Sequence, residues 1–429
     1  MKQHYLIVLL LIFGWSCATY EAKYALPFVE DSTAPVKQVE HSFFLIGDAG
    51  KSPTGALNPA LKSLKQQLDQ ADENSTVIFL GDNIYPAGLP SKQDDPEGYA
   101  LAKNHLDAQL RTVDGFGGKT MFIPGNHDWY SNGLKGLERQ EKYIQKALGS
   151  KDVFLPDNGC PIEKIEIGDN ILVIAIDTEW YLTDWDKHPN INDDCEIKNR
   201  TRFFEELESL IKKNLDKTTI IAMHHPMYTY GSHGGFFSFK QHISPNGSIP
   251  LPLLGTAINL LRRTAGATVE DQSNKIYNHL KNRIVTLSQF SNKVIFVSGH
   301  EHTLQYIVEN GIPQIVSGSG AKTGATKLVN GSQFSTGQMG YAVLKVFKDG
   351  SSHVDFYSAE PTEGRLYATE VLPADGSGVK FNYSSNFPPV KTASIYTDEE
   401  VDKSGFHKWF WGKRYRKYYA TPVEAPTVE

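Results

Sequence analysis

Six short apolar runs along the chain each end in polar residues. They span residues 42–47, 77–81, 120–125, 171–177, 219–225 and 293–300. Uninterrupted apolar runs of this length are typical of strands that are buried on both faces. Between them, the segments 57–70, 98–111, 134–148 and 198–215 carry apolar residues at spacings of three and four, which predicts helices with one apolar side. The pattern therefore predicts an α/β fold in which helices pack on sheets.

The pattern changes after Gly299. Short runs with alternating apolar and polar residues follow at 305–310, 313–320, 340–347, 353–359 and 365–372. They predict a meander of antiparallel strands. From residue 379 onward Pro and Ser interrupt the chain, and the segment 405–419, GFHKWFWGKRYRKYY, is rich in aromatic and basic residues.

Composition fits an ordinary globular protein. The 429 residues are 40% hydrophobic and 21% charged, which argues against a disordered chain. The net charge of −6 supplies no overall basic field, so we expect no specific nucleic-acid recognition.

The N-terminus predicts export. One lysine precedes an apolar run over residues 5–15, and Ser16 and Cys17 follow. The run is short for a membrane span and fits a secretory signal. It resembles a bacterial lipoprotein signal in which Cys17 receives the lipid, although a plain signal peptide with an incidental Cys17 is the alternative. We expect a signal over 1–17, a tether over 18–40, and a location in the bacterial cell envelope, in the periplasm or at the outer membrane.

The other two cysteines, Cys160 and Cys195, would then lie in an oxidising compartment. We expect them to form a disulfide. Two buried free thiols remain the alternative, because the sequence does not show how far apart their Cα atoms lie.

Polar side chains that bind metals gather at the ends of the apolar runs. The motifs are GDAG with Asp48, GDNIY with Asp82 and Tyr85, GNHD with Asn126 and His127, MHHP with His224, SHG with His233, and GHEH with His300 and His302. Ligands collect beyond the carboxyl ends of such strands. Oxygen and imidazole donors without thiolates suit hard or borderline metal ions. A single motif could be a turn aspartate or a buried histidine, but six in this order predict a metal centre.

These motifs, over roughly residues 43–320, resemble those of the calcineurin-like metallophosphoesterases, and most closely of the purple acid phosphatases. The resemblance implies a four-layer α/β/β/α sandwich of two facing mixed sheets. We expect this domain over 41–372, with an insertion at about 234–290 and a C-terminal extension over 373–429.

The resemblance also implies two metal ions. Asp48, Tyr85 and His302 would bind the first, Asp82 would bridge, and Asn126, His224 and His300 would complete the second. A phenol binds as phenolate only beside a strongly Lewis-acidic ion, so the implied pair is Fe(III) with Zn(II), Fe(II) or Mn(II). The alternative is that Tyr85 only packs against its turn.

The implied activity is hydrolysis of phosphate monoesters by metal-bound hydroxide, on a small molecule or a phosphorylated partner. His127 would act as general acid or clamp the phosphoryl group, and His233 would protonate the leaving group. We expect Asp128 to be a structural carboxylate and His225 to form part of the pocket wall or to support a ligand. A phosphodiesterase or a nucleotide or pyrophosphate hydrolase could use the same core. An envelope scaffold with a vestigial metal site is the alternative outside enzymes.

Two segments bear on partners. The insertion should shape the substrate pocket, or its apolar half could contact a membrane instead. The aromatic and basic tail at 405–419, together with a lipid on Cys17, suggests membrane association. The alternative is that these aromatic residues pack back on the catalytic sandwich.

Overall fold

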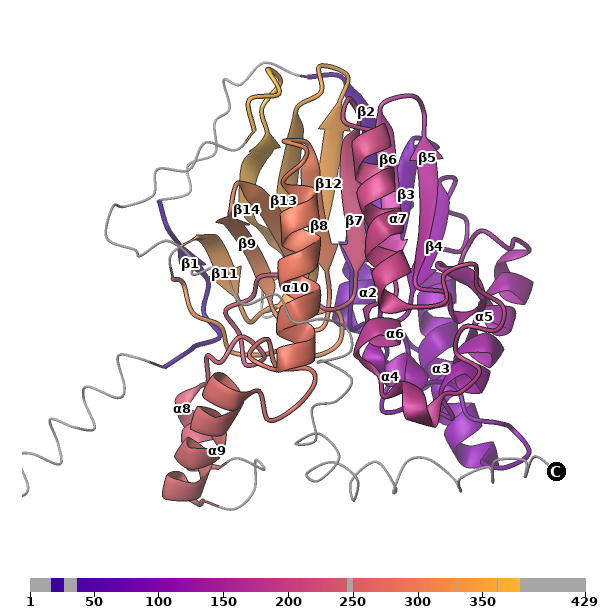
Figure 1. The fold of residues 1–429 in the computed structure, drawn as a ribbon, viewed down its shortest axis with the longest axis vertical. Coiled ribbons are helices and arrows are strands. Elements are labelled where there is room, and N and C mark those ends of the chain that lie inside the picture. Colours follow the sequence, from indigo (N-terminus) through magenta and orange to yellow (C-terminus); the bar gives the residue numbers. More distant parts are fainter. Residues whose placement is uncertain (1–16, 27–36, 245–249, 330, 361, 379–429) are drawn as a thin grey trace, which may run out of the picture.

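Two mixed β-sheets face each other, and helices cover their outer faces (Figure 1). The computed structural model describes residues 17–26, 37–244, 250–329, 331–360 and 362–378. The six-stranded sheet has the order β14 (Gly364–Leu372), β13 (Ser352–Glu360), β12 (Met339–Phe347), β2 (Val39–Ile46), β3 (Ser75–Leu80) and β4 (Lys119–Ile123). The eight-stranded sheet has the order β1 (Lys23–Tyr24), β11 (Ser332–Thr336), β9 (Leu304–Glu309), β10 (Ile312–Ser317), β8 (Val294–Ser298), β7 (Thr218–Met223), β6 (Ile171–Ile176) and β5 (Ile162–Ile167).

The centre of each sheet is parallel. In the six-stranded sheet β2, β3 and β4 run parallel, with Phe44 opposite Val77. In the eight-stranded sheet β6, β7, β8 and β10 run parallel. The remaining strands pair antiparallel at the flanks. The carboxyl ends of the parallel strands therefore lie along one edge of each sheet.

Side chains alternate between two apolar layers. Phe43 and Leu45 of β2 join a cluster made of strand residues from both sheets, which fills the space between the sheets. Phe44 and Ile46 face the other way and belong to the cluster that holds the helix residues. Burial on both faces explains why the strand sequences are continuous apolar runs rather than alternating ones.

The longer helices are α2 (Pro59–Leu68), α3 (Pro96–Thr112), α5 (Leu134–Leu148), α7 (Arg200–Lys213), α9 (Pro252–Ala265) and α10 (Lys275–Ser288). Shorter ones are α4 (Asn126–Trp129), α6 (Thr178–Leu182), α8 (Phe239–Ile243) and the 3₁₀ turns η1 (Asp157–Gly159) and η2 (Trp185–Lys187). Helices α7 and α10 lie side by side on the eight-stranded sheet (Figure 1). The start of α2 is set by Asn58, whose side chain accepts from the Leu61 N–H at 2.9 Å.

The structure confirms the predicted fold class, the six apolar strands and the four predicted helices. It corrects the C-terminal meander. Strands β9 and β10 belong to the eight-stranded sheet and β12, β13 and β14 to the other, because β10 pairs parallel with β8 whereas β12 pairs with β2. Strand order depends on such long-range pairings, which a local pattern does not contain.

Residues 18–24, at the start of the segment expected to be a tether, pair with other parts of the fold. Strand β1 pairs antiparallel with β11, the Ala18 N–H donates to the Phe237 carbonyl at 3.1 Å, and the Thr19 N–H donates to the Thr326 carbonyl at 2.9 Å. An edge strand leaves N–H and C=O groups unpaired, and residues 18–24 satisfy some of them.

Cys160 and Cys195 form a disulfide, with Cα atoms 5.4 Å apart. The expected signal run at 5–15 and the aromatic and basic tail at 405–419 lie outside the described residues. Among the described residues, none of the helices combines the length and the apolar character needed to cross a bilayer.

Candidate metal centre

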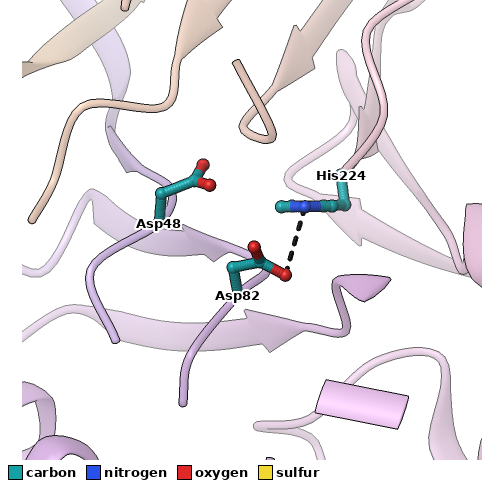
Figure 2. Close-up of side chains that lie close together, drawn as sticks. All are labelled: Asp48, Asp82 and His224. Atoms are coloured by element: carbon teal, nitrogen blue, oxygen red, sulfur yellow. Dashed lines mark ion pairs between the residues drawn. The ribbon is translucent and has the colours of Figure 1, made fainter. Parts of the chain in front are cut away.

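The predicted ligand residues all follow strands of the parallel regions. Asp48 follows β2, Asp82 follows β3, and Asn126 begins α4 after β4. From the facing sheet, His224 follows β7 and His300 follows β8. Figure 2 shows the side chains of Asp48, Asp82 and His224 converging from three loops. Ligand atoms of these three buried residues lie within 4.8 Å of one another.

A glycine directly precedes four of the ligands and lets these loops approach; the four are Asp48, Asp82, Asn126 and His300. A Cβ on Gly299 would lie 2.7 Å from Asp48 Oδ2, and a Cβ on Gly125 would lie 2.3 Å from the Asp82 backbone nitrogen. Asp48, Asp82 and His300 themselves have positive φ angles of 58°, 54° and 66°. Non-glycine residues adopt this left-handed conformation rarely, and such backbone strain concentrates at functional sites.

One group of side chains joins Asp48, Tyr85 and His302. The Tyr85 hydroxyl donates to Asp48 Oδ1 at 2.7 Å and lies 3.3 Å from His302 Nε2. His302 Nε2 lies 3.4 Å from Asp48 Oδ1. These are the three residues expected around the first metal ion.

A second group joins Asp82, Asn126 and His224. His224 Nε2 lies 3.3 Å from Asp82 Oδ1 and 3.1 Å from Asn126 Oδ1. The other ring nitrogen of His224 donates to the Leu80 carbonyl at 2.7 Å, so the Nε2 lone pair faces the carboxylate and the amide oxygen. This arrangement turns three ligand atoms toward one point.

His300 is next to this second group, and its contacts there are between aromatic rings. Its ring centroid is 5.1 Å from that of His224 and 4.2 Å from those of His225 and His233. Its backbone N–H donates to Asp48 Oδ2 at 2.7 Å, which ties the two sheets together at the site. Burial lowers the pKa of His300, and the neighbouring imidazoles lower it further, so its ring stays neutral and able to bind a metal.

The carboxylates are shielded from water and need compensating charge. Burial alone would raise the pKa of Asp82, but His224 and His127 outweigh it, and the pKa lies below its usual range. Burial raises the pKa of Tyr85, and Asp48 and Asp82 raise it further. Buried carboxylates with imidazole, amide and phenol donors form a donor set that suits a metal ion of hard or borderline character. The residues present therefore fit a metal centre.

His127, expected beside the phosphoryl group, lies at the edge of the second group. Its Nδ1 is 2.5 Å from the Pro86 carbonyl and its Nε2 is 3.9 Å from Asp82 Oδ2. With Nδ1–H donating to the carbonyl, Nε2 is the nitrogen that faces the site. His127 side-chain exposure is 27%, so Nε2 can meet a ligand from solvent.

Asp128, expected to be structural, holds the loops of two ligands. It accepts from the backbone N–H groups of Asn83 and Ile84, from that of Gly125 and from the Gln140 amide. Asp128 therefore fixes the GDN loop against the GNHD loop. His225, expected in the pocket wall, is buried, and its Nδ1 lies 2.7 Å from the Thr178 hydroxyl.

The sequence reasoning missed Glu301, which lies between the two histidines of GHEH. Its carboxylate accepts from the backbone N–H groups of Ser232 at 2.9 Å and His233 at 3.0 Å. His233 is thereby held near the site, with its ring against that of His300. Its place in the sequence, as an acidic residue between two ligand histidines after a strand, was the signal that could have identified Glu301.

Glu270 and Lys322 were also missed. Glu270, from the insertion, accepts from the Asn126 amide at 3.2 Å and from the Tyr130 hydroxyl. The Lys322 ammonium lies 3.0 Å from the centroid of the Tyr85 ring. Burial lowers the pKa of Lys322, while Asp82 and Asp48 oppose that change. Neither residue belongs to a motif, so their placement depends on the loops that carry them.

Comparison with known proteins identifies one family. The calcineurin-like phosphoesterase family matches residues 41–304. No curated protein matches the chain.

Several solved structures resemble this one at low identity. GAP50, the anchor in the inner membrane complex of Plasmodium, is 17% identical, with a TM-score of 0.45 over 78% of this chain and 89% of that one. Purple acid phosphatase PPD1 from yellow lupin (Lupinus luteus) seeds is 16% identical, with a TM-score of 0.45 over 77% of this chain and 53% of that one. The calcineurin-like phosphoesterase YfkN from Bacillus subtilis is 13% identical, with a TM-score of 0.38 over 80% and 94%.

Proposed function

The chain belongs to the calcineurin-like phosphoesterase family, and from this premise we propose that it is a metal-dependent phosphohydrolase that acts on phosphate monoesters. One observation carries the proposal. Two groups of ligand side chains lie together at the carboxyl ends of the parallel strands of both sheets, one around Asp48 and one around Asp82. Members of this family typically bind two metal ions.

We propose that Asp48, Tyr85 and His302 hold one ion, that Asp82 bridges, and that the remaining ligands, Asn126, His224 and His300, hold the other. Two such ions, when bound, supply Lewis-acid polarisation of the phosphoryl group and lower the pKa of water.

The position of the Tyr85 hydroxyl, between Asp48 and His302, supports a phenol ligand and therefore Fe(III) at the first position. Burial and two carboxylates raise the pKa of its phenol, so the hydroxyl keeps its proton and donates it to Asp48. Only a strongly acidic cation offsets that preference and stabilises the phenolate. We propose Fe(III) with Zn(II), Fe(II) or Mn(II) as its neighbour.

Lys322 and the two histidines at the site favour a phosphate monoester, because the phosphate group of a monoester carries more negative charge than that of a diester. Lys322 lies over the Tyr85 ring and brings a positive charge to the first group. Protonated His127 would donate from Nε2 to a phosphoryl or leaving-group oxygen, while its Nδ1 stays anchored on Pro86. His233 is held by Glu301 and would supply a proton to the leaving alkoxide.

We also propose that the protein is exported to the cell envelope and carries a lipid on Cys17. The disulfide between Cys160 and Cys195 supports an oxidising compartment. In this proposal the phosphohydrolase domain spans residues 41–372, and the insertion at 234–290 contributes Glu270 to the site, which its contact with Asn126 supports.

A substrate panel on the purified full chain tests the activity. The panel contains 4-nitrophenyl phosphate, bis(4-nitrophenyl) phosphate, ATP and pyrophosphate, with metal content measured on the same sample. We expect kcat/KM for the monoester to exceed that for the diester by about tenfold or more, and Asp82→Asn to abolish it. The matched control is Asp169→Asn, at an exposed turn carboxylate.

Faster diester or nucleotide turnover would replace the monoester proposal with one of its alternatives. A protein that holds less than one metal ion per chain and hydrolyses nothing in the panel would be a binding or scaffold module instead.

A further inference from the structure

The two helices α8 and α9 of the insertion expose an apolar face. Leu254, Leu260 and Leu261 of α9 are 52%, 59% and 55% exposed, and Phe239 of α8 is 46% exposed. Figure 1 shows α8 and α9 projecting from the sandwich beside β1. Leu254 and Leu261 are two helical turns apart, so they share one side of α9.

The opposite side of α9 is small and polar, and this is the side that meets the protein. Asn259 is buried, and Gly255 is buried beside it one turn earlier. On the same side Arg262 donates to both oxygens of the buried Asp271. Surface helices of globular proteins normally turn their apolar side inward. Helix α9 has the reverse orientation, so its leucine side is free to meet an apolar partner.

The start of the described chain lies against the residues that begin α8. The Ala18 N–H donates to the Phe237 carbonyl at 3.1 Å, and Ala18 forms a parallel bridge with Ser238, the N-cap of α8. Cys17 is one residue away, and the sequence before it is the apolar run at 5–15. Of the twelve exposed large hydrophobic side chains among the described residues, eight lie at positions 20–26 or 239–261. Exposed apolar surface is therefore concentrated where the chain would meet a lipid anchor.

Charge favours a lipid surface over a second protein. From Phe236 to Val269 the sequence contains Lys240, Arg262 and Arg263 but no acidic residue, although the whole chain is negatively charged. Lys240 and Arg263 are exposed near the apolar face. Apolar side chains with flanking cations are the combination that binds the interface of anionic bilayers.

We propose that the face formed by Phe239, Leu254, Leu260 and Leu261 docks on the headgroup and acyl boundary of a lipid bilayer. The lipid proposed on Cys17 would hold that residue at the membrane. The backbone contacts of Ala18 with Phe237 and Ser238 place the apolar face beside it. A lipid on Cys17 would hold the chain at one point only, so a second contact of this kind stabilises the attachment and limits rotation about that point. Docking by this face sets the orientation of the sandwich on the membrane.

Site-specific labelling tests this orientation in the full chain. The fluorophore NBD is attached at Leu261→Cys, and at Leu215→Cys as the control, because Leu215 is similarly exposed, at 49%, next to α7. The probe is a vesicle of phosphatidylethanolamine and phosphatidylglycerol at a ratio of about three to one, an anionic surface of the kind such faces bind. We expect vesicles to shift the emission of the label at 261 to the blue and to slow its reduction by dithionite about fivefold or more, because dithionite remains in water. The label at 215 should not change.

Three results would overturn the proposal. Equal dithionite reduction of both labels would show that the face does not enter the lipid. Protection at 261 without vesicles would show that the apolar run at 5–15 covers the face, and protection that rises with protein concentration would show a second copy of the chain.

A second variant separates docking from folding and activity. The triple substitution Leu254→Gln, Leu260→Gln, Leu261→Gln in a Cys17→Ala chain should lower vesicle partitioning about 100-fold, since it removes three half-exposed leucines. Hydrolysis of 4-nitrophenyl phosphate should be unchanged. Unchanged partitioning in this variant would also overturn the proposal, independently of the outcome for the activity.

Discussion

Replacing Asp128 by Asn should destabilise the protein although it changes a single atom. Asp128 Oδ1 accepts from Asn83 N, Ile84 N and Gln140 Nε2, at 3.1, 3.2 and 3.1 Å. Its Oδ2 accepts from Gly125 N at 2.8 Å and from Asn83 Nδ2 at 3.1 Å. Every group around the carboxylate is therefore a donor. An Asn side chain must turn its NH₂ toward one of these sets in either orientation.

The magnitude follows from the donors that lose their acceptor. At least two buried N–H groups would face the new NH₂, and each unsatisfied donor costs about 1–3 kcal/mol, so the free energy of unfolding should fall by about 2–6 kcal/mol. For a folded unit of roughly 350 residues, the entropy of unfolding is about 0.7 kcal/mol per kelvin near 60 °C. The melting temperature should therefore fall by about 3–8 °C.

The assay is a calorimetric scan at pH 8 with a chelator in the buffer. Burial, together with the nearby charge of Asp82, raises the pKa of Asp128 to about 6, so pH 8 keeps the carboxylate ionised in the native protein. The chelator removes any contribution from metal binding, which the substitution would also weaken. Asp169→Asn, at an exposed carboxylate in the turn after β5, is the matched control. A melting temperature within about 1 °C of that control would show that the donors find other acceptors, and the reasoning would be wrong.

Four further predictions test the site and its surroundings. Tyr85→Phe should remove a visible charge-transfer band from the iron-loaded protein, and an unchanged spectrum would contradict the assignment of Tyr85 as an iron ligand. Asp82→Asn should lower both metal content and turnover, whereas His127→Ala should keep its metal and lose about 10²- to 10⁴-fold in turnover; equal metal loss in both would mean that His127 is a ligand. Glu270→Ala removes the carboxylate that accepts from the Asn126 amide and holds this ligand in place. Metal affinity, measured by competition with a chelator, should therefore fall about 10- to 100-fold. Unchanged affinity would show that Glu270 does not position Asn126. Burial raises the pKa of Glu141 from its ordinary value of 4.5 to about 7, so its contribution to stability is present below pH 4.5 and is lost as the pH rises through about 7. Relative to Glu141→Gln, the native protein should lose roughly 1–3 kcal/mol of its free energy of unfolding over that range. Parallel curves of melting temperature against pH for the two proteins would contradict this prediction.

The positions of the proposed ligands could be predicted from the sequence because each is set locally. Asp48, Asp82 and His300 each follow a buried strand after one glycine. His224 follows its strand directly, and Asn126 follows its strand after Pro124 and Gly125. A strand that is apolar on both faces must end where its sequence turns polar. Apolar residues at spacings of three and four predicted the four main helices, whereas the two facing sheets were implied by the family resemblance of the motifs.

Only the tertiary structure determined how these pieces pair. That β12 lies beside β2, and that β10 lies beside β8, depends on contacts between residues far apart in the chain. Glu270 reaches Asn126 from a segment 144 residues later, with no motif to mark it. Helix α9 shows the limit most clearly. The sequence shows that this segment is apolar in part, but it does not show whether the leucines face the core or the surroundings. That depends on tertiary contacts such as the ion pair between Arg262 and buried Asp271, which holds the polar side inward.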